Sequence, residues 1–515
     1  MRKKKLFLNT IFSLTYQIVT VVCGLILPRL FLQTYGSQTN GLVSSISQFL
    51  GIISFVELGI GAVVQSALYK PLADSDSDKI NSILTAAQKF FNKLVIILLG
   101  YVVILAFVYP LFVANEFDYI FTASLVVIIS ISSFAQFFIG IPDSLLLNAD
   151  QKAFIQLITQ IIALILNTVV CSLLVLNNVG IHYVKIATSI IFLLRPIVVR
   201  LYINRHYKIK RNVQLIEDPI QQRRNGVAQH VAAVVLDGTD TLVLTTFSTL
   251  TNVSIYNVYN LGVNGIKQVV ISMTTGVQPL IGELWAKNEK EELKKVFSAT
   301  EWAIHNGVIF CFGCTAFLIV PFVLVYTSGV TDANYNLPLF GLLLTLANGI
   351  HCLRLPYFDI AVKACNHYRQ TQLNFIVTTI INVVVSIILV NFLGLIGVAI
   401  GTLVALLYQT IWMIIYVYKN LMPFDKKGFF KLLLGDIIFI VLGSVSSLFV
   451  PSFSTNFGLW IAQAFIIAGI WIGAFLLTNI IIHRNFLKSF LARLFLRKKN
   501  KKNKGDDYTI NSDAI

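Results

Sequence analysis

Long apolar runs alternate with short polar segments from near the start of the chain to about residue 482. A helix that crosses the hydrocarbon core of a membrane needs about 20 mainly apolar residues. The runs that reach this length are 8–32, 42–68, 92–114, 119–147, 154–176, 181–203, 226–249, 254–281, 302–327, 337–362, 371–393, 395–418, 431–450 and 457–482. The pattern therefore predicts an all-α polytopic membrane protein with about 14 transmembrane helices.

The composition agrees with a membrane protein, and the basic residues orient it. The chain of 515 residues is 56% hydrophobic and 12% charged, so it cannot form one water-soluble globule. Lys and Arg favour the cytoplasmic side of a membrane. Here they gather in alternate loops, at Arg2–Lys5, Lys70–Lys93, Lys152, Arg200–Arg224, Lys287–Lys295, Lys363–Arg369 and Lys419–Lys427.

This alternation predicts the topology of the chain. Only one of the 40 Lys and Arg residues, Lys185, falls on the outer side of the membrane in this scheme, at the start of the span 181–203. An even number of spans with both termini in the cytoplasm fits every loop. The net charge of +16 is then explained by topology, and no nucleic-acid partner is expected.

The two halves of the chain come into register when one is shifted by about 212 to 215 residues. Matching positions include Gln17 with Gln229, Asn40 with Asn252, and Asn167 with Asn382. The segments 76–92 and 288–300 also match, and both are expected to be short amphipathic helices on the cytoplasmic face. Since each repeat has six spans, the two repeats share one orientation, which makes them parallel repeats.

The duplication predicts how the domains are organised. We expect an N-terminal six-helix lobe over 1–212, a C-terminal six-helix lobe over 213–424, two additional transmembrane helices over 425–484, and a basic, disordered cytoplasmic tail over 485–515. Parallel six-span halves commonly enclose a substrate site that opens to each side in turn. The architecture therefore favours a transporter that works by alternating access.

Four cations lie at membrane depth, where an ionisable group costs about 2.5–3.5 kcal/mol and marks a pathway or a partner. These are the candidate substrate-binding residues Arg29, Arg195, Lys267 and Arg354. Glu57 lies two residues from the position that matches Lys267, so we expect the two to pair when no substrate is bound. The alternatives are a purely structural ion pair, and placement of Arg29 or Arg195 at a membrane surface.

Acidic residues in the spans are candidates for ion coupling or gating. Asp237 and Asp240 are three residues apart and share one helical face, so they can bind Na⁺ or carry H⁺. The alternative is hydrogen bonding between helices. Asp359 is five residues from Arg354, a poor spacing for a pair within one helix, so we expect each to contact another helix. His305 and His351 near span ends are interpreted as packing residues.

Other chemistry is not indicated by the sequence. No His, Cys and carboxylate cluster has the spacing of a metal site, and there is no P-loop or dinucleotide fingerprint, so no metal or cofactor is expected. The predicted outer loops are short and carry no paired catalytic groups. An enzyme is therefore not predicted.

Several polar and glycine positions in the first two spans carry a family resemblance. The residues are Asn9, Gln17, Pro28-Arg29, Gly36, Asn40-Gly41-Leu42, Gln48-Phe49, Glu57-Leu58-Gly59-Ile60-Gly61 and Tyr69-Lys70-Pro71. This run resembles the N-terminal half of the Wzx-type polysaccharide flippases, which belong to a superfamily with the MATE drug/ion antiporters and the lipid II flippase.

The resemblance implies a function. It implies a flippase in the bacterial plasma membrane that moves polyprenyl-pyrophosphate-linked oligosaccharide from the cytoplasmic to the outer leaflet, coupled to H⁺ or Na⁺, for capsule or other surface polysaccharide. Arg29, Lys267 and Arg354 would bind the pyrophosphate, and the last two helices would hold the lipid tail. Polysaccharide assembly enzymes are implied partners. The lipid II relative has several arginines in its first two spans, whereas this chain has Arg29 alone there, which argues against lipid II.

Three alternatives stay open at this point. The first is an ion-coupled multidrug exporter, for which acidic groups alone would suffice. The second, from another class, is a membrane enzyme of polysaccharide assembly. The third is a scaffold that recruits assembly enzymes through its basic tail.

Overall fold

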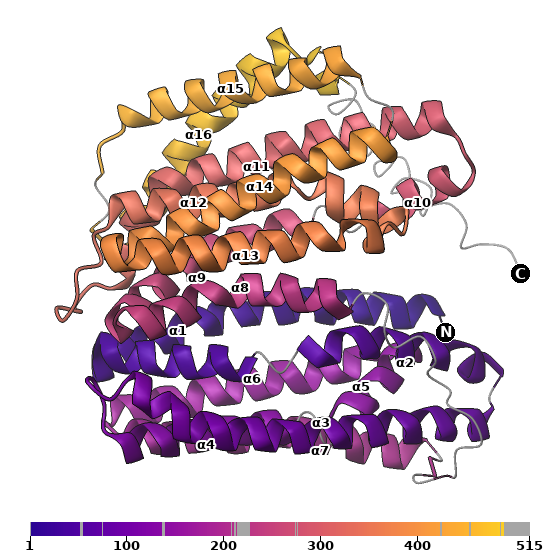
Figure 1. Cartoon of the computed structure of the whole chain (residues 1–515), viewed down its shortest axis with the longest axis vertical. Helices are drawn as coiled ribbons and strands as arrows, with labels where there is room; N and C mark the ends of the chain where they lie inside the picture. The colour runs from indigo at the N-terminus through magenta and orange to yellow at the C-terminus, as the bar shows by residue number, and fades with distance from the viewer. Residues whose placement is uncertain are drawn as a thin grey trace, which may run out of the picture. The chain divides into compact units, whose positions relative to one another are not determined.

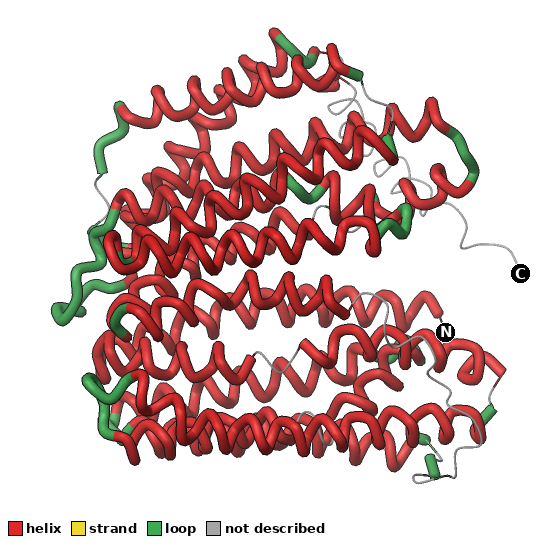
Figure 2. The backbone as a smooth tube through the Cα atoms, viewed as in Figure 1, coloured by secondary structure: helices red, strands yellow, loops and turns green. Residues whose placement is uncertain are grey.

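The computed structural model describes residues 2–51, 55–74, 76–135, 140–207, 209–210, 213, 227–272, 274, 277–422, 425–452, 455–484 and 486–488. These residues form helices joined by short turns, with no strand among them (Figures 1 and 2). The elements are α1 (Arg2–Gly51), α2 (Phe55–Asp74), α3 (Ser77–Phe112), α4 (Tyr119–Ala135), α5 (Ile141–Ala149), α6 (Ala153–Leu176), α7 (Ile181–His206), α8 (Val227–Phe247), α9 (Leu250–Ser272), α10 (Gln278–Ala286), α11 (Lys290–Tyr326), α12 (Pro338–Leu353), η3 (Pro356–Val362), α13 (Tyr368–Leu393), α14 (Leu395–Asn420), α15 (Lys426–Leu448) and α16 (Phe457–Ile481).

The all-α, polytopic membrane fold predicted from the hydrophobic pattern is confirmed. Ten of the described helices are long and apolar enough to cross a membrane. Each predicted span overlaps a described helix or two consecutive ones, such as 337–362, which is occupied by α12 and the π-helix η3. The count of fourteen spans stays a prediction, because several of these helices are too short or too polar to qualify alone.

The two predicted amphipathic segments are not separate helices. Residues from Ser77 onward run without a break into the third predicted span as the 36-residue helix α3, and α11 extends over 37 residues in the same way. Asp76 caps α3 by accepting a hydrogen bond from the backbone nitrogen of Lys79. Neither proline nor glycine lies between the amphipathic part and the start of the apolar part, so one helix carries both.

The turns of the backbone show the internal duplication. Gln151, which precedes α6, and Asn366, which precedes α13, both adopt a left-handed conformation, with φ of 57° and 58°. Asn178 after α6 and Gly394 after α13 do the same, each with φ of 55°. Both pairs are offset by about 215 residues, the offset found in the sequence. Left-handed backbone is uncommon outside glycine, so the two halves share turn geometry as well as helix order.

Side-chain contacts repeat with the same offset. Cys171 of α6 places its Sγ 3.8 Å from the carbonyl oxygen of Val184 in α7. At the matching positions, Oγ of Ser386 in α13 lies 3.5 Å from the carbonyl oxygen of Val398 in α14. The α6–α7 and α13–α14 hairpins are therefore similar in this contact, as the predicted duplication implies.

The chain divides into two compact units. Unit 1 comprises Met1–Gly265, Tyr326–Leu344 and Tyr368–Tyr408, and unit 2 comprises Ile266–Val325, Thr345–His367 and Gln409–Ile515. In unit 1, α1 packs along α6, α6 along α7, and α8 along α13. The predicted lobes 1–212 and 213–424 and the tail stay predictions.

Glycine allows close helix contacts within each unit. In unit 1, a Cβ added to Gly41 of α1 would lie 1.9 Å from the carbonyl oxygen of Leu250, so α1 and the start of α9 touch through their backbones. In unit 2, a Cβ on Gly313 of α11 would lie 2.2 Å from the indole of Trp471 in α16. Small residues at such positions let membrane helices approach closely.

Candidate functional site

The carboxylate of Asp240 lies at the centre of a buried polar network in unit 1. Asp240 belongs to α8 and is 4% exposed. Its Oδ1 accepts a hydrogen bond of 2.6 Å from Oγ1 of Thr402 in α14, and its Oδ2 accepts one of 3.0 Å from the phenol of Tyr256 in α9. Nδ2 of Asn382 in α13 donates to the same Thr402 hydroxyl at 2.9 Å. Four helices thus contribute to one network around the carboxylate of Asp240.

This network contains an unused acceptor. Oδ1 of Asn382 is buried and accepts no hydrogen bond from the described residues. An orphaned acceptor in a membrane interior costs free energy unless a donor, a water molecule or a cation meets it. Asp240, Asn382 and Thr402 together offer oxygen atoms of the kind that Na⁺ binds, and Asp240 alone can hold a proton. The arrangement can therefore bind one small cation.

Two of the predicted acidic residues, Glu57 and Asp237, have side chains outside the described part of the structure. Glu57 lies in α2 and Asp237 lies in α8. The predicted Glu57–Lys267 pair and the shared site of Asp237 with Asp240 stay predictions.

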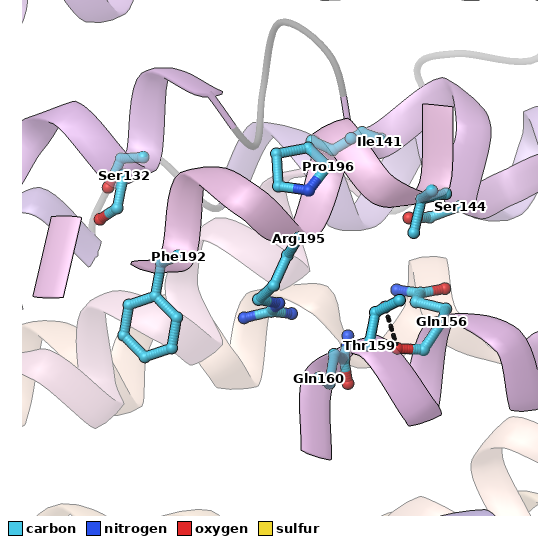
Figure 3. Close-up of a pocket in the computed structure, with 12 residues that line it drawn as sticks. Ser132, Ile141, Ser144, Gln156, Thr159, Gln160, Phe192, Arg195 and Pro196 are labelled. Atoms are coloured by element: carbon cyan, nitrogen blue, oxygen red, sulfur yellow. Dashed lines mark hydrogen bonds between the residues drawn. The ribbon is translucent and has the colours of Figure 1, made fainter. Parts of the chain in front are cut away.

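Arg195 lines a polar pocket in unit 1 (Figure 3). The cavity has a volume of about 140 Å³, and none of its lining residues is acidic. The guanidinium of Arg195 in α7 points toward the part of α6 that carries Thr159 and Gln160 (Figure 3), and it lies 5.8 Å from the ring of Phe192. The hydroxyl and amide groups of the lining come from Ser132, Ser133, Ser144, Gln156, Thr159 and Gln160. A cation among neutral polar groups suits an anionic or a polyhydroxyl ligand.

The neighbouring Arg200 is engaged differently. Its Nε forms an ion pair with Asp143 of α5, and its Nη2 lies 3.5 Å from Oε1 of Gln88 in α3. Arg200 of α7 thus pairs with a buried acid, whereas Arg195 of the same helix faces the pocket.

Lys267 and Arg354 both interact electrostatically with one residue of unit 2. Lys267 of α9 and Arg354, which follows α12, both lie close enough to His351 for an electrostatic interaction. Arg354 is 5% exposed, and its guanidinium lies 5.0 Å from the ring centroid of Phe358. Two cations from different helices thus share one neighbourhood in the part of the chain that the sequence had marked for anion binding.

Asp359 has a partner in its own segment, and its expected contact with another helix stays a prediction. Asp359 forms an ion pair with Lys363, four residues further along the same segment. The cause is local, because η3 and its C-cap place Lys363 one turn after Asp359.

Arg29 and Lys185 both lie in helices of unit 1. Arg29 of α1 interacts with Tyr326, whose phenol donates a hydrogen bond of 2.8 Å to the carbonyl oxygen of Leu25. Lys185 lies in the second turn of α7, with its Nζ 4.5 Å from the ring centroid of Phe31. Whether Arg29 binds substrate stays a prediction.

A charged cluster outside the spans ties the first helix to the segment between α5 and α6. Asp150 forms ion pairs with Lys5 at 3.0 Å and Lys152 at 2.7 Å, and it accepts a hydrogen bond from the phenol of Tyr207. Burial opposes ionisation of Asp150, but the hydrogen bonds from Lys152, Tyr207 and Lys5 outweigh it and lower the pKa of this carboxyl.

The sequence analysis missed a second buried network, in unit 2. Glu301 and His305 of α11 are linked by hydrogen bonds to Tyr357 of η3, and His305 also contacts Asp436 of α15. His305 is therefore more than the packing residue that we expected. One signal was present, since Asp436 lies inside the predicted span 431–450, where an acid marks a site or a partner.

The arrangement of helices is similar to that of solved transporters. The lipid II flippase MurJ in an inward closed conformation matches with a TM-score of 0.69 and 17% sequence identity, over 93% of this chain and all of the flippase chain. The eukaryotic MATE transporter AtDTX14 matches with a TM-score of 0.56 and 12% identity, over 84% of this chain and 98% of the transporter chain. No protein-family model and no curated protein matches the sequence. The chain is thus a multi-pass membrane protein with the fold shared by these transporters.

Proposed function

We propose that this protein is an ion-coupled flippase. It moves a polyprenyl-pyrophosphate-linked oligosaccharide repeat unit from the cytoplasmic to the outer leaflet of the bacterial plasma membrane, for assembly of capsule or another surface polysaccharide. Both termini lie in the cytoplasm, and enzymes of polysaccharide assembly are its expected partners. The observation that carries the proposal is that two cations from different helices, Lys267 and Arg354, both interact electrostatically with His351, in a fold shared with a lipid II flippase.

The cations account for substrate choice. A pyrophosphate carries several negative charges, and transfer of these charges into the membrane is costly unless cations meet them. Lys267 and Arg354 would supply such cations, and the planar guanidinium of Arg354 suits two phosphate oxygens at once. Arg29 and the Arg195 pocket in unit 1 would contact other parts of the headgroup.

Asp240 would couple transport to an ion. Two of its hydrogen-bond donors, Thr402 of α14 and Tyr256 of α9, come from different helices, which both follow α8 in the chain. Binding of Na⁺ or H⁺ would replace one of these bonds and change how α8, α9 and α14 hold together. A ligand shifts a conformational equilibrium only through its different affinity for the two states, and this rearrangement would provide such a difference.

An ion-coupled drug exporter is the second candidate. It is favoured by the buried Asp240, which would serve a cationic drug and a coupling ion equally well, and by the similarity to a MATE transporter. The cluster of cations in unit 2 disfavours it, because a cationic drug would be repelled there.

The test is deletion of the gene, followed by analysis of polyprenyl-linked sugars and of surface polymer. The flippase predicts that complete repeat units accumulate on the cytoplasmic leaflet while surface glycan is lost, and that the wild-type gene restores both. Unchanged glycan with a new sensitivity to drugs would favour the exporter. Repeat units that reach the outer leaflet but stay unpolymerised would favour an enzyme.

A further inference from the structure

A chain of titratable side chains is buried in unit 2. Glu301 and His305 lie one helical turn apart on α11, so their side chains share a face of the helix. The two residues are 4% and 3% exposed. Neither is used by the proposed substrate or coupling sites, so both need another explanation.

Two phenols converge on Glu301. Tyr418 of α14 donates a hydrogen bond of 2.6 Å to Oε1 of Glu301, and Tyr357 of η3 donates to the same oxygen. Oε1 of Glu301 therefore accepts hydrogen bonds from two different elements, α14 and η3. Phe297 borders both phenols, with its ring centroid 6.2 Å from that of Tyr357 and 6.1 Å from that of Tyr418. The carboxyl group of Glu301 is thus enclosed by two phenols and an apolar ring.

His305 is held between an acid and one of these phenols. Its Nδ1 lies 2.7 Å from Oδ2 of Asp436 in α15, and its Nε2 lies 3.4 Å from the phenol oxygen of Tyr357. A histidine that donates through Nδ1 to a carboxylate keeps Nε2 for a second partner. Tyr357 therefore stands between His305 and Glu301 and touches both.

Further titratable groups surround these four residues. Asp425 interacts with Tyr418 and lies 3.8 Å from Nζ of Lys294. Lys431 of α15 and Asp436 both interact electrostatically with His483, which follows α16. Nε2 of His483 is buried and has no hydrogen-bond partner among the described residues.

We propose that Glu301, Tyr357, His305 and Asp436 form a proton-binding site in unit 2, where one proton is shared between Glu301 and His305 through the phenol of Tyr357. With His305 protonated, its Nε2–H bond breaks as that proton moves to the oxygen of Tyr357. The proton of Tyr357 moves at the same time to Oε1 of Glu301. The imidazolium and the carboxylate both become neutral, and no other reactant is needed.

The site links three elements of unit 2, namely α11, η3 and α15. Tyr357 is the second residue of the π-helix η3, and π-helical turns are frequent at functional sites. When the proton leaves His305, its ion pair with Asp436 becomes a neutral hydrogen bond and α15 is held to α11 more weakly. The site would thus make the attachment of α15 depend on pH. Its use in transport rests on the proposed function, whereas proton binding itself does not.

Infrared spectroscopy of the full-length protein in lipid nanodiscs tests the site, with the proton as the only ligand. Lowering the pH from about 8 to 5 should produce the carbonyl stretch of a buried carboxylic acid. Labelling with ¹³C-glutamate should shift this band, and E301Q should remove it. Y418F is the matched control and should keep it, since Tyr418 does not contact His305. Absence of the band, or its survival in E301Q, would overturn the proposal.

A second measurement tests the relay through Tyr357. In a protein with Tyr357 intact, D436N should shift the pH midpoint of the Glu301 band. In the Y357F protein, which keeps the ring but lacks the hydroxyl, adding D436N should leave the midpoint unchanged. Equal shifts in both backgrounds would mean that the two charges act through space and would refute the relay. These measurements use no substrate. A pH-dependent Glu301 band would therefore support the proton-binding site even if the flippase proposal failed. If the protein flips its substrate but Glu301 gives no infrared band at any pH, the proton-binding site is refuted and the flippase proposal is not.

Discussion

Thr402 of α14 donates a hydrogen bond of 2.6 Å to Oδ1 of Asp240 in α8, across 162 residues of sequence. The bond connects the last helix of the second repeat with its first. It also places the buried acid of unit 1 beside Asn382, whose Oδ1 lacks a donor among the described residues. This relationship is the basis of the first prediction.

Replacement of Asp240 by Asn should remove the response of transport to an ion gradient. The amide is neutral, so it can neither carry a proton nor balance a bound cation. In proteoliposomes, the ratio of flipping with the gradient to flipping without it should fall to about one. The conservative change Thr402→Ser keeps the hydroxyl and should retain the response. Asp237 is expected to share the site, so the test also uses the double variant Asp237→Asn with Asp240→Asn. A full response in the double variant would place ion coupling elsewhere.

Replacement of Lys267 by Ala should abolish display of surface polymer while the protein is still inserted in the membrane. The change removes one of the two cations near His351, and the remaining cation would meet the pyrophosphate alone. Polymer on whole cells and the amount of membrane-inserted protein are measured together. Lys267→Arg keeps the charge and should restore at least part of the display. Normal display by the Ala variant would remove Lys267 from the mechanism.

Replacement of Gly41 by Ala should destabilise the protein. The new methyl group would lie 1.9 Å from the carbonyl oxygen of Leu250, so α1 and α9 would have to move apart. Overpacking of this kind costs about 1–3 kcal/mol. Gly24→Ala is the matched control in the same helix, because nothing lies within 4 Å of its added Cβ. Thermal unfolding in detergent should show a lower Tm for the first variant only. Equal Tm values would show that this close contact does not hold α1 in place.

The Asp150 cluster should stabilise the protein at neutral pH and lose this effect in acid. The pKa of Asp150 is lowered in the folded state, so its contribution is present above the ordinary pKa of about 3.9 and disappears as the pH falls through the lower, folded value. Partly exposed ion pairs contribute about 0.2–1 kcal/mol. Asp150→Asn should therefore lower the Tm slightly at pH 7.

The same variant provides the pH test. Below a pH of about 4, the Tm difference between the wild-type protein and Asp150→Asn should shrink, because the wild-type carboxyl is then protonated as well. A difference that stays constant or grows toward low pH would mean that Asp150 acts through packing and not through its charge.

The candidate sites were predictable only in part. Asp240 was found because a charge inside an apolar run is rare and costly, but its partners Thr402 and Tyr256 were not. Hydroxyl residues occur throughout the spans, and nothing in the local sequence distinguishes the two that reach the acid. Asp359 was assigned to another helix because its spacing from Arg354 was unfavourable, although Lys363 stood one turn further on.

Glu301 and Asp436 show the same limit. Glu301 lies between the predicted amphipathic segment 288–300 and the predicted span 302–327, so it is not among the charges that the sequence places inside the membrane. In the structure it is 4% exposed, because α11 is continuous and the phenols of Tyr357 and Tyr418 cover its carboxylate. The depth of a residue at the end of a span depends on what packs over it, and those elements lie 56 and 117 residues away in the chain.

The sequence by itself determined the class of the fold, the positions of the helices and the duplication. Membrane thickness sets the length of an apolar run, so a spanning helix can be recognised in the sequence alone. A duplication keeps matching residues at a constant offset, which the sequence also shows. Only the tertiary structure decided which polar groups meet: Asp240 with Thr402, His305 with Asp436, and Lys267 and Arg354 with His351. The reason is physical. A buried charge is stabilised by whichever groups packing brings within a few ångströms, and packing between helices depends on residues distributed over the whole chain.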